Sequence, residues 1–386
     1  MLNIEPRIEN SKAMAWISPF IAIFLTMLAS SIIFTLLDVS PVKAFDVFII
    51  QPVSDTYNIG ELLVKATPLL LCATGLAICY RANIWNIGAE GQLLIGAIAT
   101  SYVAIQATDT SGNGLFFVAL LAGIGAGMAW AAIPTLLNRA FHTNIILTTI
   151  MLNYIGLYTL LWAVHGPLAD PQGFGFPESV MFPDSVLLPL LLDQGRASVS
   201  VIVAVAIALL CGFVLFKTLP GFKVRVYGED QHAARYAGFS ANKIIWAVML
   251  FSGALAGFAG AAEVTGPIGQ LIPSVSPGYG YAAIIVAYLG RLNPFGIILS
   301  SFFMGALYMG CDLAQIELGL PTAITGLFQG SLLFFLLACD FLIFYRIRLV
   351  SPKAIWSKKS PPSKPSTTTN SEGTTVHPES QNQGVV

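Results

Sequence analysis

Charge is what this chain has least of. Lysine, arginine, aspartate and glutamate supply 10% of its 386 residues, whereas hydrophobic residues supply 55%. A soluble domain has about 25% charged residues, so a chain this apolar cannot shield itself from water by folding alone. The formal net charge of −1, with cations scattered along the chain, also excludes the basic surface that binds nucleic acid.

Signals for metal, disulfide and catalytic chemistry are missing too. The five cysteines lie in apolar runs without the paired spacing of a zinc site or a disulfide framework, and the four histidines lie far apart. The sequence has no HExxH pair, no convincing Ser/His arrangement and no cluster of acids, which argues against an intramembrane enzyme. The phosphate loop of ATPases, G-x-x-x-x-G-K-S/T, is also absent, so we predict no catalytic residue, no metal and no cofactor bound by this chain.

What the chain has instead is long apolar runs. A helix that crosses the hydrocarbon of a bilayer needs about 20 mostly apolar residues. Charge-free runs of this kind predict an all-α, polytopic transmembrane bundle of about ten spans; the second run is short, and the eighth shares the Gly/Pro-rich connection 265–280. The runs are 13–37, 66–80, 91–108, 110–138, 140–169, 197–216, 244–262, 264–290, 292–311 and 318–339.

The cations predict the orientation of these spans. Cytoplasmic loops collect lysine and arginine. With the N-terminus inside, ten crossings leave only Lys43, Lys65 and Arg196 of the 19 cations outside. Both termini are therefore predicted to be cytoplasmic.

The same reading divides the chain into three parts. We expect a cytoplasmic N-terminus at 1–14, a transmembrane domain at 15–348 and a cytoplasmic tail at 349–386, whose Ser-, Thr- and Pro-rich composition predicts disorder. The longest external loop, about 166–197, contains five prolines. It is either an irregular cap over the outer mouth, where a soluble binding protein can land, or a simple spacer.

A cluster of polar residues opens the third run. Asn86, Glu90 and Gln92 lie at the start of a predicted membrane helix. Polar groups in lipid are costly and are kept where they face the bundle interior or an aqueous path. Two roles fit equally well: contact with a transported solute, or helix capping with interhelical hydrogen bonds.

Uncharged polar side chains deeper in the spans are further candidates. Asn153 and Tyr154 lie in the fifth run and Gln329 in the tenth. Their side chains can bond the hydroxyls or base edge of a solute, or they can bond neighbouring helices. We predict a solute pathway through these residues and keep the interhelical role as the alternative.

The longest internal cytoplasmic loop, about 218–243, contains a short predicted helix. Gly228 and Gly238 mark its ends, and Ala233, Ala234 and Ala237 give it a small-residue face that fits a groove on a soluble partner. A partner that moved this helix would tilt the spans on either side. The alternative is an ordinary amphipathic loop helix.

Three ordered motifs carry a resemblance to a known family. They are Asn-Ile-Gly-Ala-Glu-Gly-Gln at 86–92, preceded by Trp85, and the segments 228–238 and 277–294. Together they resemble the signatures of ABC transporter permeases for ribose, other simple sugars, branched-chain amino acids and nucleosides. Trp85 and the lead from Glu61 to Pro68 most resemble the nucleoside branch, the purine nucleoside permeases linked to basic membrane proteins.

This resemblance implies a function for about residues 15–348. The chain would be the membrane-spanning permease subunit of an ATP-binding-cassette importer, multi-pass in the cell inner membrane, and it would carry a nucleoside or related small polar solute without being an enzyme. The implied partners are an ABC ATPase subunit that holds ATP and Mg, a second permease subunit that is a different chain, an extracytoplasmic solute-binding lipoprotein and membrane lipid.

The resemblance also gives the short loop helix a role, that of docking the ATPase. One position departs from the family: Asp230 stands where the family often has Asn, which leaves the details of the ATPase contact open. The residues implied for this coupling helix are Gly228, Glu229, Asp230, His232, Ala233, Ala234, Arg235, Tyr236, Ala237 and Gly238.

Two rival functions remain open. One is a simple-sugar permease of the ribose type, because no motif here encodes the shape of the solute pocket. The other is a secondary transporter driven by protons or sodium, which a membrane carboxylate such as Glu90 can support. A self-contained carrier would not need an ATPase-docking loop.

Overall fold

The computed structural model describes residues 2–6, 12–108, 114–191, 195–321 and 323–349. The described residues form two compact units, one within Ser11–Ile343 and the other from the two ends of the chain. The second unit contains strands β1 (Leu2–Pro6) and β2 (Tyr345–Leu349), which pair antiparallel with Leu2 opposite Leu349. This pairing corrects the all-α prediction at the chain ends, where both segments alternate apolar and polar residues with the period of a strand. Of the tail 349–386 that was predicted to be disordered, Leu349 lies in β2 and residues 350–386 lie outside the described residues.

The first unit is helical, and each of its ten main described helices overlaps one of the ten predicted runs. Seven of the described helices, α1, α3, α5, α6, α7, α10 and α12, are long and apolar enough to cross a membrane. The ten are α1 (Lys12–Leu36), α3 (Thr56–Arg81), α4 (Ala89–Ala104), α5 (Gly114–Phe141), α6 (Ile145–His165), α7 (Ser200–Lys217), α10 (Ala241–Glu263), α11 (Tyr279–Leu289), α12 (Pro294–Leu318) and α13 (Ala323–Phe344).

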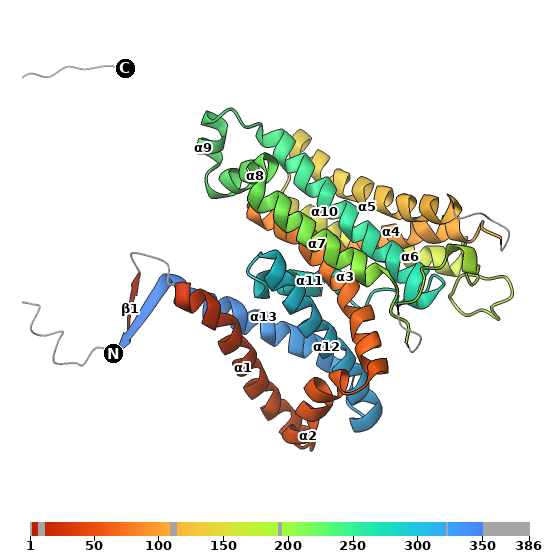
Figure 1. Ribbon diagram of the computed structural model, residues 1–386, viewed down its shortest axis with the longest axis horizontal. Coiled ribbons are helices and arrows are strands. Elements are labelled where there is room, and N and C mark those ends of the chain that lie inside the picture. The colour runs from red at the N-terminus through yellow and green to blue at the C-terminus, as the bar shows by residue number, and fades with distance from the viewer. Residues whose placement is uncertain (1, 7–11, 109–113, 192–194, 322, 350–386) are drawn as a thin grey trace, which may run out of the picture. The chain divides into compact units, whose positions relative to one another are not determined.

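Short elements connect these helices. The first connection contains α2 and two irregular turns, the longest loop contains a 3-10 turn, and α8 and α9 join α7 to α10 (Figure 1). They are α2 (Pro41–Phe45), η1 (Asp46–Ile50), η2 (Gln51–Val53), η3 (Asp184–Val186), α8 (Leu219–Glu229), α9 (Gln231–Tyr236) and η4 (Val264–Ile268).

Two predicted spans differ from the observed helices. Helix α3 begins at Thr56, well before residue 66, because the two charges that shortened the predicted run, Glu61 and Lys65, are neutralised by Arg196 and Asp312. The eighth run does not form one helix. After the π-helical turn η4 the chain is irregular as far as Gly278, and α11 has only 11 residues, which is about 16 Å against a hydrocarbon thickness of about 30 Å.

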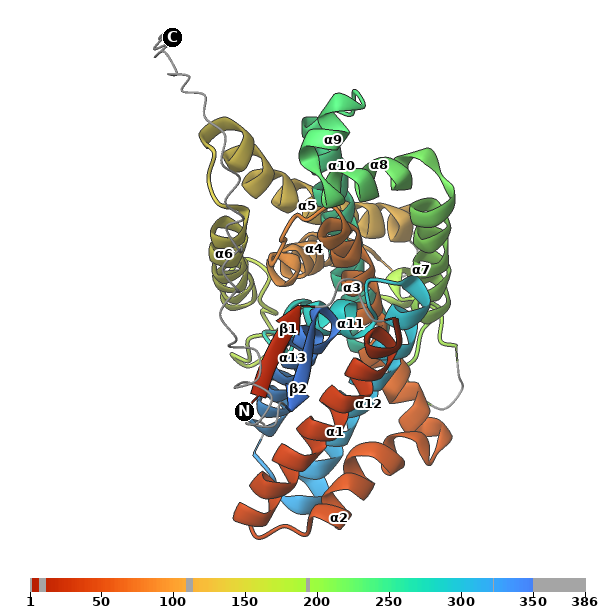
Figure 2. The same cartoon turned by 90° about the vertical axis from the view of Figure 1, so that its left-hand side faces the viewer.

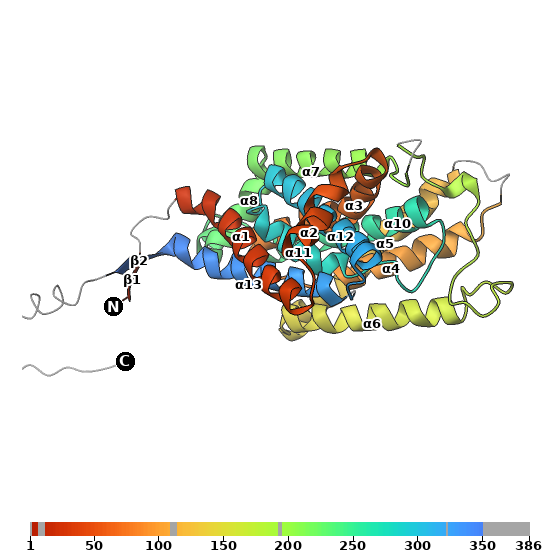
Figure 3. The ribbon, with the colours of Figure 1, turned by 90° about the horizontal axis from the view of Figure 1, so that it is seen from below.

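Helices α3 and α10 form the centre of the bundle and run in opposite directions. They pack against each other; α10 also packs against α4 and α5, while α3 packs against α11 and α12. Each of the two is followed by an irregular segment and then by a short helix, α4 or α11. The two halves therefore repeat the same arrangement, a long helix, a break and a short helix, with opposite orientations. Repeats of inverted topology are common in membrane transporters. Helix α6 lies along one side of this bundle (Figure 3).

Small residues bring α4, α5 and α10 into backbone contact. A Cβ atom on Gly257 would lie 2.3 Å from the carbonyl oxygen of Gly123, and one on Gly253 would lie 2.5 Å from that of Gly127. Small residues four apart on a membrane helix allow this kind of backbone-to-backbone packing. Gly125, by contrast, faces no atom within 4 Å.

Residues 166–191 of the long loop fold over the irregular segment that follows η4. Backbone N–H groups of Phe182 and Leu188 donate to the carbonyl oxygens of Gly269 and Thr265, each at 2.8 Å. The Ser179 N–H also donates to the Leu271 carbonyl oxygen at 3.0 Å. The long loop is therefore attached to the bundle at the point where α10 breaks, as a cap would be and a free spacer would not.

Candidate functional site

A buried hydrogen-bond network lies where α3 ends and α4 begins. The Asn86 amide donates to the Ser252 hydroxyl at 3.2 Å, and its oxygen accepts from the Gly88 N–H at 2.8 Å. Gln92 faces the same amide, with its oxygen 3.4 Å from the Asn86 nitrogen. Since Ser252 is the middle residue of α10, the chain turns back into the bundle after α3 and starts α4 near the middle of a membrane helix.

Helix α6 closes this network from the other side. The Asn153 side chain accepts from the Gly91 N–H at 2.9 Å and donates to the Ile87 carbonyl oxygen at 2.8 Å. The Thr149 hydroxyl accepts from the Ile87 N–H at 3.3 Å. These bonds satisfy backbone groups that the break before α4 leaves without helical partners.

Glu90 joins the two short helices. It lies in the first turn of α4, and its carboxylate accepts a 2.7 Å hydrogen bond from the N–H of Gly280 in the first turn of α11. A Cβ atom on Gly280 would lie 2.2 Å from the Glu90 nitrogen, so only glycine allows this approach. The buried carboxylate thus lies at the N-terminal ends of two helices, where backbone N–H groups point toward it.

The structure brings together four of the six predicted pathway residues. Asn86, Glu90, Gln92 and Asn153 are all buried in the network. Asn86, Glu90 and Asn153 make the interhelical and capping bonds of the alternative interpretation, and Gln92 bonds the Asn86 side chain. Tyr154, on α6, is 54% exposed.

Gln329 belongs to a different cluster, on α13. It lies near the phenol of Tyr308, whose oxygen is 3.5 Å from the Pro277 carbonyl oxygen. The Tyr308 ring also packs edge-on against Tyr279, with centroids 5.4 Å apart. Gln329 therefore supports the irregular segment before α11 and takes no part in the Asn86 network.

Helix α9 is exposed at one end of the bundle, which we call the coupling end (Figure 2). The Asp230 carboxylate caps this helix by accepting from the His232 N–H at 2.7 Å. Asn is an equally good N-cap, so the departure from the family preserves the cap. Ala233 and Tyr236 are exposed, whereas Ala234 is fully buried. Ala234 therefore packs inside the chain and is not available for the docking face predicted for it.

The glycines predicted to end this helix occupy different positions. Gly238, with a φ of 78°, lies just after α9 in the left-handed conformation that ends a helix. Gly228 lies inside α8, and a Cβ there would fall 1.9 Å from the carbonyl oxygen of Arg81. The backbones of α8 and the last residue of α3 are therefore in direct contact.

At the opposite end of α3 and α10, which we call the ion-pair end, charges pair between elements. The buried Glu61 accepts two bonds from Arg196, at 2.9 and 2.5 Å, and Lys65 pairs with Asp312 at 3.1 Å. The hydrogen bonds that Arg196 donates to Glu61 favour the charged guanidinium and raise the pKa of Arg196 above its ordinary value. Two of the three cations predicted to be external are thus neutralised at this end.

Several residues of these sites were not predicted as site residues. Ser252 was not singled out and Gly280 lay only within the motif 277–294, because a partner for Asn86 or Glu90 far along the chain has no local signal. The pairing of Glu61 with Arg196 did have a local signal, because an acid or a cation that interrupts or borders a long apolar run requires a partner.

Inverted halves with broken helices, a buried polar network at the break and an exposed helix at one end define a polytopic membrane transport protein. The family model for the branched-chain amino acid transport system permease component matches residues 58–337, and the chain belongs to this family.

Three curated relatives show the range of the family. The guanosine ABC transporter permease protein NupP of Bacillus subtilis is 32% identical over 87% of this chain and 95% of its own length. The glucose ABC transporter permease protein TsgB13 of Haloferax volcanii is 31% identical over 90% and 93%. The nucleoside ABC transporter permease protein NupB of Lactococcus lactis is 26% identical over 90% and 96%. Among solved structures, PsaBC from Streptococcus pneumoniae in complex with Fab covers 81% of this chain and 98% of its own at 15% identity and a TM-score of 0.41.

The family gives the general function. The chain is a multi-pass permease subunit of an ABC importer in the cell inner membrane. The predicted resemblance to permeases of nucleosides and simple sugars is confirmed.

Proposed function

We propose that this chain moves a nucleoside or related small polar solute inward, with a separate ABC ATPase as the motor. The observation that carries the proposal is the contact of Gly228 with Arg81, because it links the exposed helix α9 to a central helix of the bundle. ATP and Mg bind the partner, and closure of the ATPase pushes α9 and α8 against the end of α3. The orientation follows the cation distribution, with ten crossings, both termini and α9 in the cytoplasm.

In this proposal α3 carries the movement to the solute path. The Asn86 network begins five residues after α3 ends and binds α4 to α6 and α10. Glu90 then ties α4 to the first turn of α11. We assign Asn86, Gln92 and Asn153 a structural role, in which they stabilise the irregular segment between α3 and α4. We assign Glu90, Tyr154 and Gln329 to the wall of the solute path.

The remaining partners act at the outer side and in the membrane. An extracytoplasmic binding lipoprotein delivers the solute to the segment 166–197, which caps the break after α10. A second permease subunit, of a different chain, completes the path between the two subunits.

Reconstitution tests both the motor and the cargo. Vesicles that contain both permeases, the ATPase and the binding lipoprotein are expected to take up radiolabelled guanosine only with internal ATP, and an excess of unlabelled inosine is expected to compete. Uptake by this chain alone under a proton or sodium gradient would reject the ATP-driven proposal.

A simple sugar is the second candidate solute, favoured by the 31% identity to a glucose permease component. The same vesicles distinguish the two cargoes. Uptake of glucose or ribose without uptake of guanosine would reject the nucleoside assignment and leave the ATP-driven mechanism intact.

A further inference from the structure

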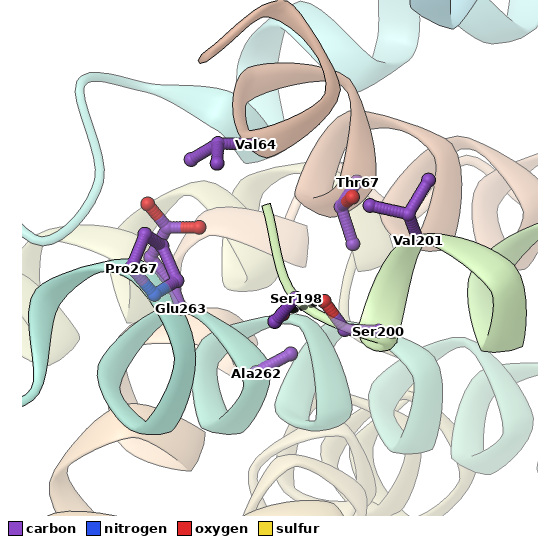
Figure 4. A pocket seen from close by; sticks show the side chains of 8 residues that line it. All are labelled: Val64, Thr67, Ser198, Ser200, Val201, Ala262, Glu263 and Pro267. Atoms are coloured by element: carbon purple, nitrogen blue, oxygen red, sulfur yellow. Dashed lines mark hydrogen bonds between the residues drawn. The ribbon is translucent and has the colours of Figure 1, made fainter. Parts of the chain in front are cut away.

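A small cavity at the ion-pair end has an unusual lining. It lies between α3, the start of α7 and the end of α10, and it is large enough for one water molecule. Four of its lining side chains carry oxygen atoms: Thr67, Ser198, Ser200 and Glu263. All four are buried. Figure 4 shows the Glu263 carboxylate on one side of the space and the hydroxyls of Thr67 and Ser200 on the other.

Glu263 has no hydrogen-bond partner among the residues that the structure describes. The neighbouring hydroxyls bond elsewhere: Thr67 donates to the Leu63 carbonyl oxygen at 2.8 Å, and Ser198 and Ser200 share a 2.6 Å bond. Each of these oxygens keeps a lone pair that can face the cavity. A buried carboxylate costs several kcal/mol in general unless it binds a proton or a cation, and the oxygen-lined cavity beside Glu263 offers space for a cation.

The charges around Glu263 do not cancel. Lys65, Arg196 and Glu61 act on it electrostatically, and it in turn acts on the Tyr279 phenol. Arg196 is already paired with Glu61, and Lys65 with Asp312. Two cations and three carboxylates therefore meet here, and the carboxylate in excess is Glu263.

We propose that this cavity binds a dehydrated alkali cation, held by the Glu263 carboxylate and the hydroxyls of Thr67, Ser198 and Ser200. A single carboxylate with neutral oxygens suits a monovalent ion, whereas calcium needs about six to eight oxygen ligands and magnesium an octahedral set. The bound ion balances the excess charge and joins α3, α7 and α10 at the ion-pair end. This site is independent of the solute and of the ATPase.

Thermal unfolding of the purified full-length chain in detergent tests the proposal. Sodium chloride and potassium chloride are titrated against choline chloride at constant ionic strength. We expect the unfolding temperature of the wild type to rise and saturate with sodium or potassium but not with choline, because a ligand that binds only the folded state stabilises it. Isothermal titration calorimetry of the same samples is expected to give one site per chain.

Three variants locate the ion. Glu263→Gln is expected to abolish the response, and Ser200→Ala, which keeps the charge, is expected to raise the half-maximal concentration by about tenfold or more. The control is Glu317→Gln, an exposed carboxylate at the end of α12, which is expected to respond like the wild type. If Glu263→Gln does not fold, the titration of Ser200→Ala still shows whether the cation binds in this cavity.

Two outcomes would overturn the site. The first is an equal unfolding temperature in sodium, potassium and choline, including the case in which stability depends on pH alone and Glu263 holds a proton. The second is a cation response that Glu263→Gln and Ser200→Ala leave unchanged.

Discussion

The two ends of the central helices are built in opposite ways. At the coupling end, Gly228 leaves no side chain between α8 and Arg81, so the contact is made by backbone atoms. At the ion-pair end, side chains bridge the elements through Glu61 with Arg196 and Lys65 with Asp312. A backbone contact transmits displacement rigidly, whereas ion pairs at a partly exposed edge can separate and form again. In the proposed mechanism the coupling end drives the movement and the ion-pair end yields to it.

The largest effect is expected from filling the contact at the coupling end. Gly228→Ala places a methyl group 1.9 Å from the Arg81 carbonyl oxygen, and overpacking of this kind costs about 3 kcal/mol. We expect a lower unfolding temperature and loss of ATP-driven uptake. Gly125→Ala, at a position with no atom within 4 Å, is the matched control and should leave both unchanged. Wild-type uptake in Gly228→Ala would refute the rigid contact.

Breaking the buried pair at the ion-pair end should come next. Glu61→Gln leaves the guanidinium of Arg196 without its carboxylate, and removal of one partner of a buried pair costs about 3 kcal/mol. Because the Arg196 side chain is 55% exposed, we expect a loss below that value, measured as a decrease in unfolding temperature. An Arg196→Gln background should reduce the effect of Glu61→Gln, and independent effects would contradict the pairing.

Two exposed aromatic residues, one on α9 and one on the long loop between α6 and α7, can be compared. Tyr236 is 97% exposed and Phe174 is 99% exposed. Tyr236→Ala is expected to weaken copurification with the ATPase by about 2 kcal/mol, or roughly 30-fold, as for an interface hot spot. Phe174→Ala should leave that association unchanged, and neither change should alter the unfolding temperature. Equal loss of ATPase in both variants would contradict docking at α9.

The smallest effect is expected at the more exposed pair of the ion-pair end. The Asp312 side chain is 47% exposed, 3.1 Å from Lys65, and pairs of this kind contribute about 1 kcal/mol or less. Asp312→Asn should lower the unfolding temperature slightly in low salt and have no effect in high salt, because exposed pairs are screened. A larger effect than that of Glu61→Gln would reverse the ranking of the two pairs.

Much of the fold follows from local patterns in the sequence. Apolar runs indicate where the main helices lie, because each membrane helix satisfies its own backbone hydrogen bonds and reads as a continuous stretch. The errors occur where a distant partner changes the cost of a local feature. Glu61 and Lys65 are tolerated inside α3 only because Arg196 and Asp312 meet them from elsewhere in the chain.

The residues of the candidate site could be predicted from the sequence, but their distant partners could not. The cost of polar groups in a membrane helix singles out Asn86, Glu90, Gln92 and Asn153, which lie together. That cost does not distinguish a solute contact from a network that holds a broken helix. The distinction depends on Ser252 and Gly280, and only the packing of α10 and α11 reveals those partners.

The side of the membrane on which α9 lies tests the account most directly. All five native cysteines are buried, so a membrane-impermeant maleimide should react only with cysteines introduced at exposed positions. The account predicts that an Ala233→Cys variant is labelled in inside-out vesicles but not in intact cells, and a Phe174→Cys variant in intact cells but not in inside-out vesicles. Labelling of the Ala233→Cys variant from outside intact cells would contradict it, because no cytoplasmic ATPase could then reach α9.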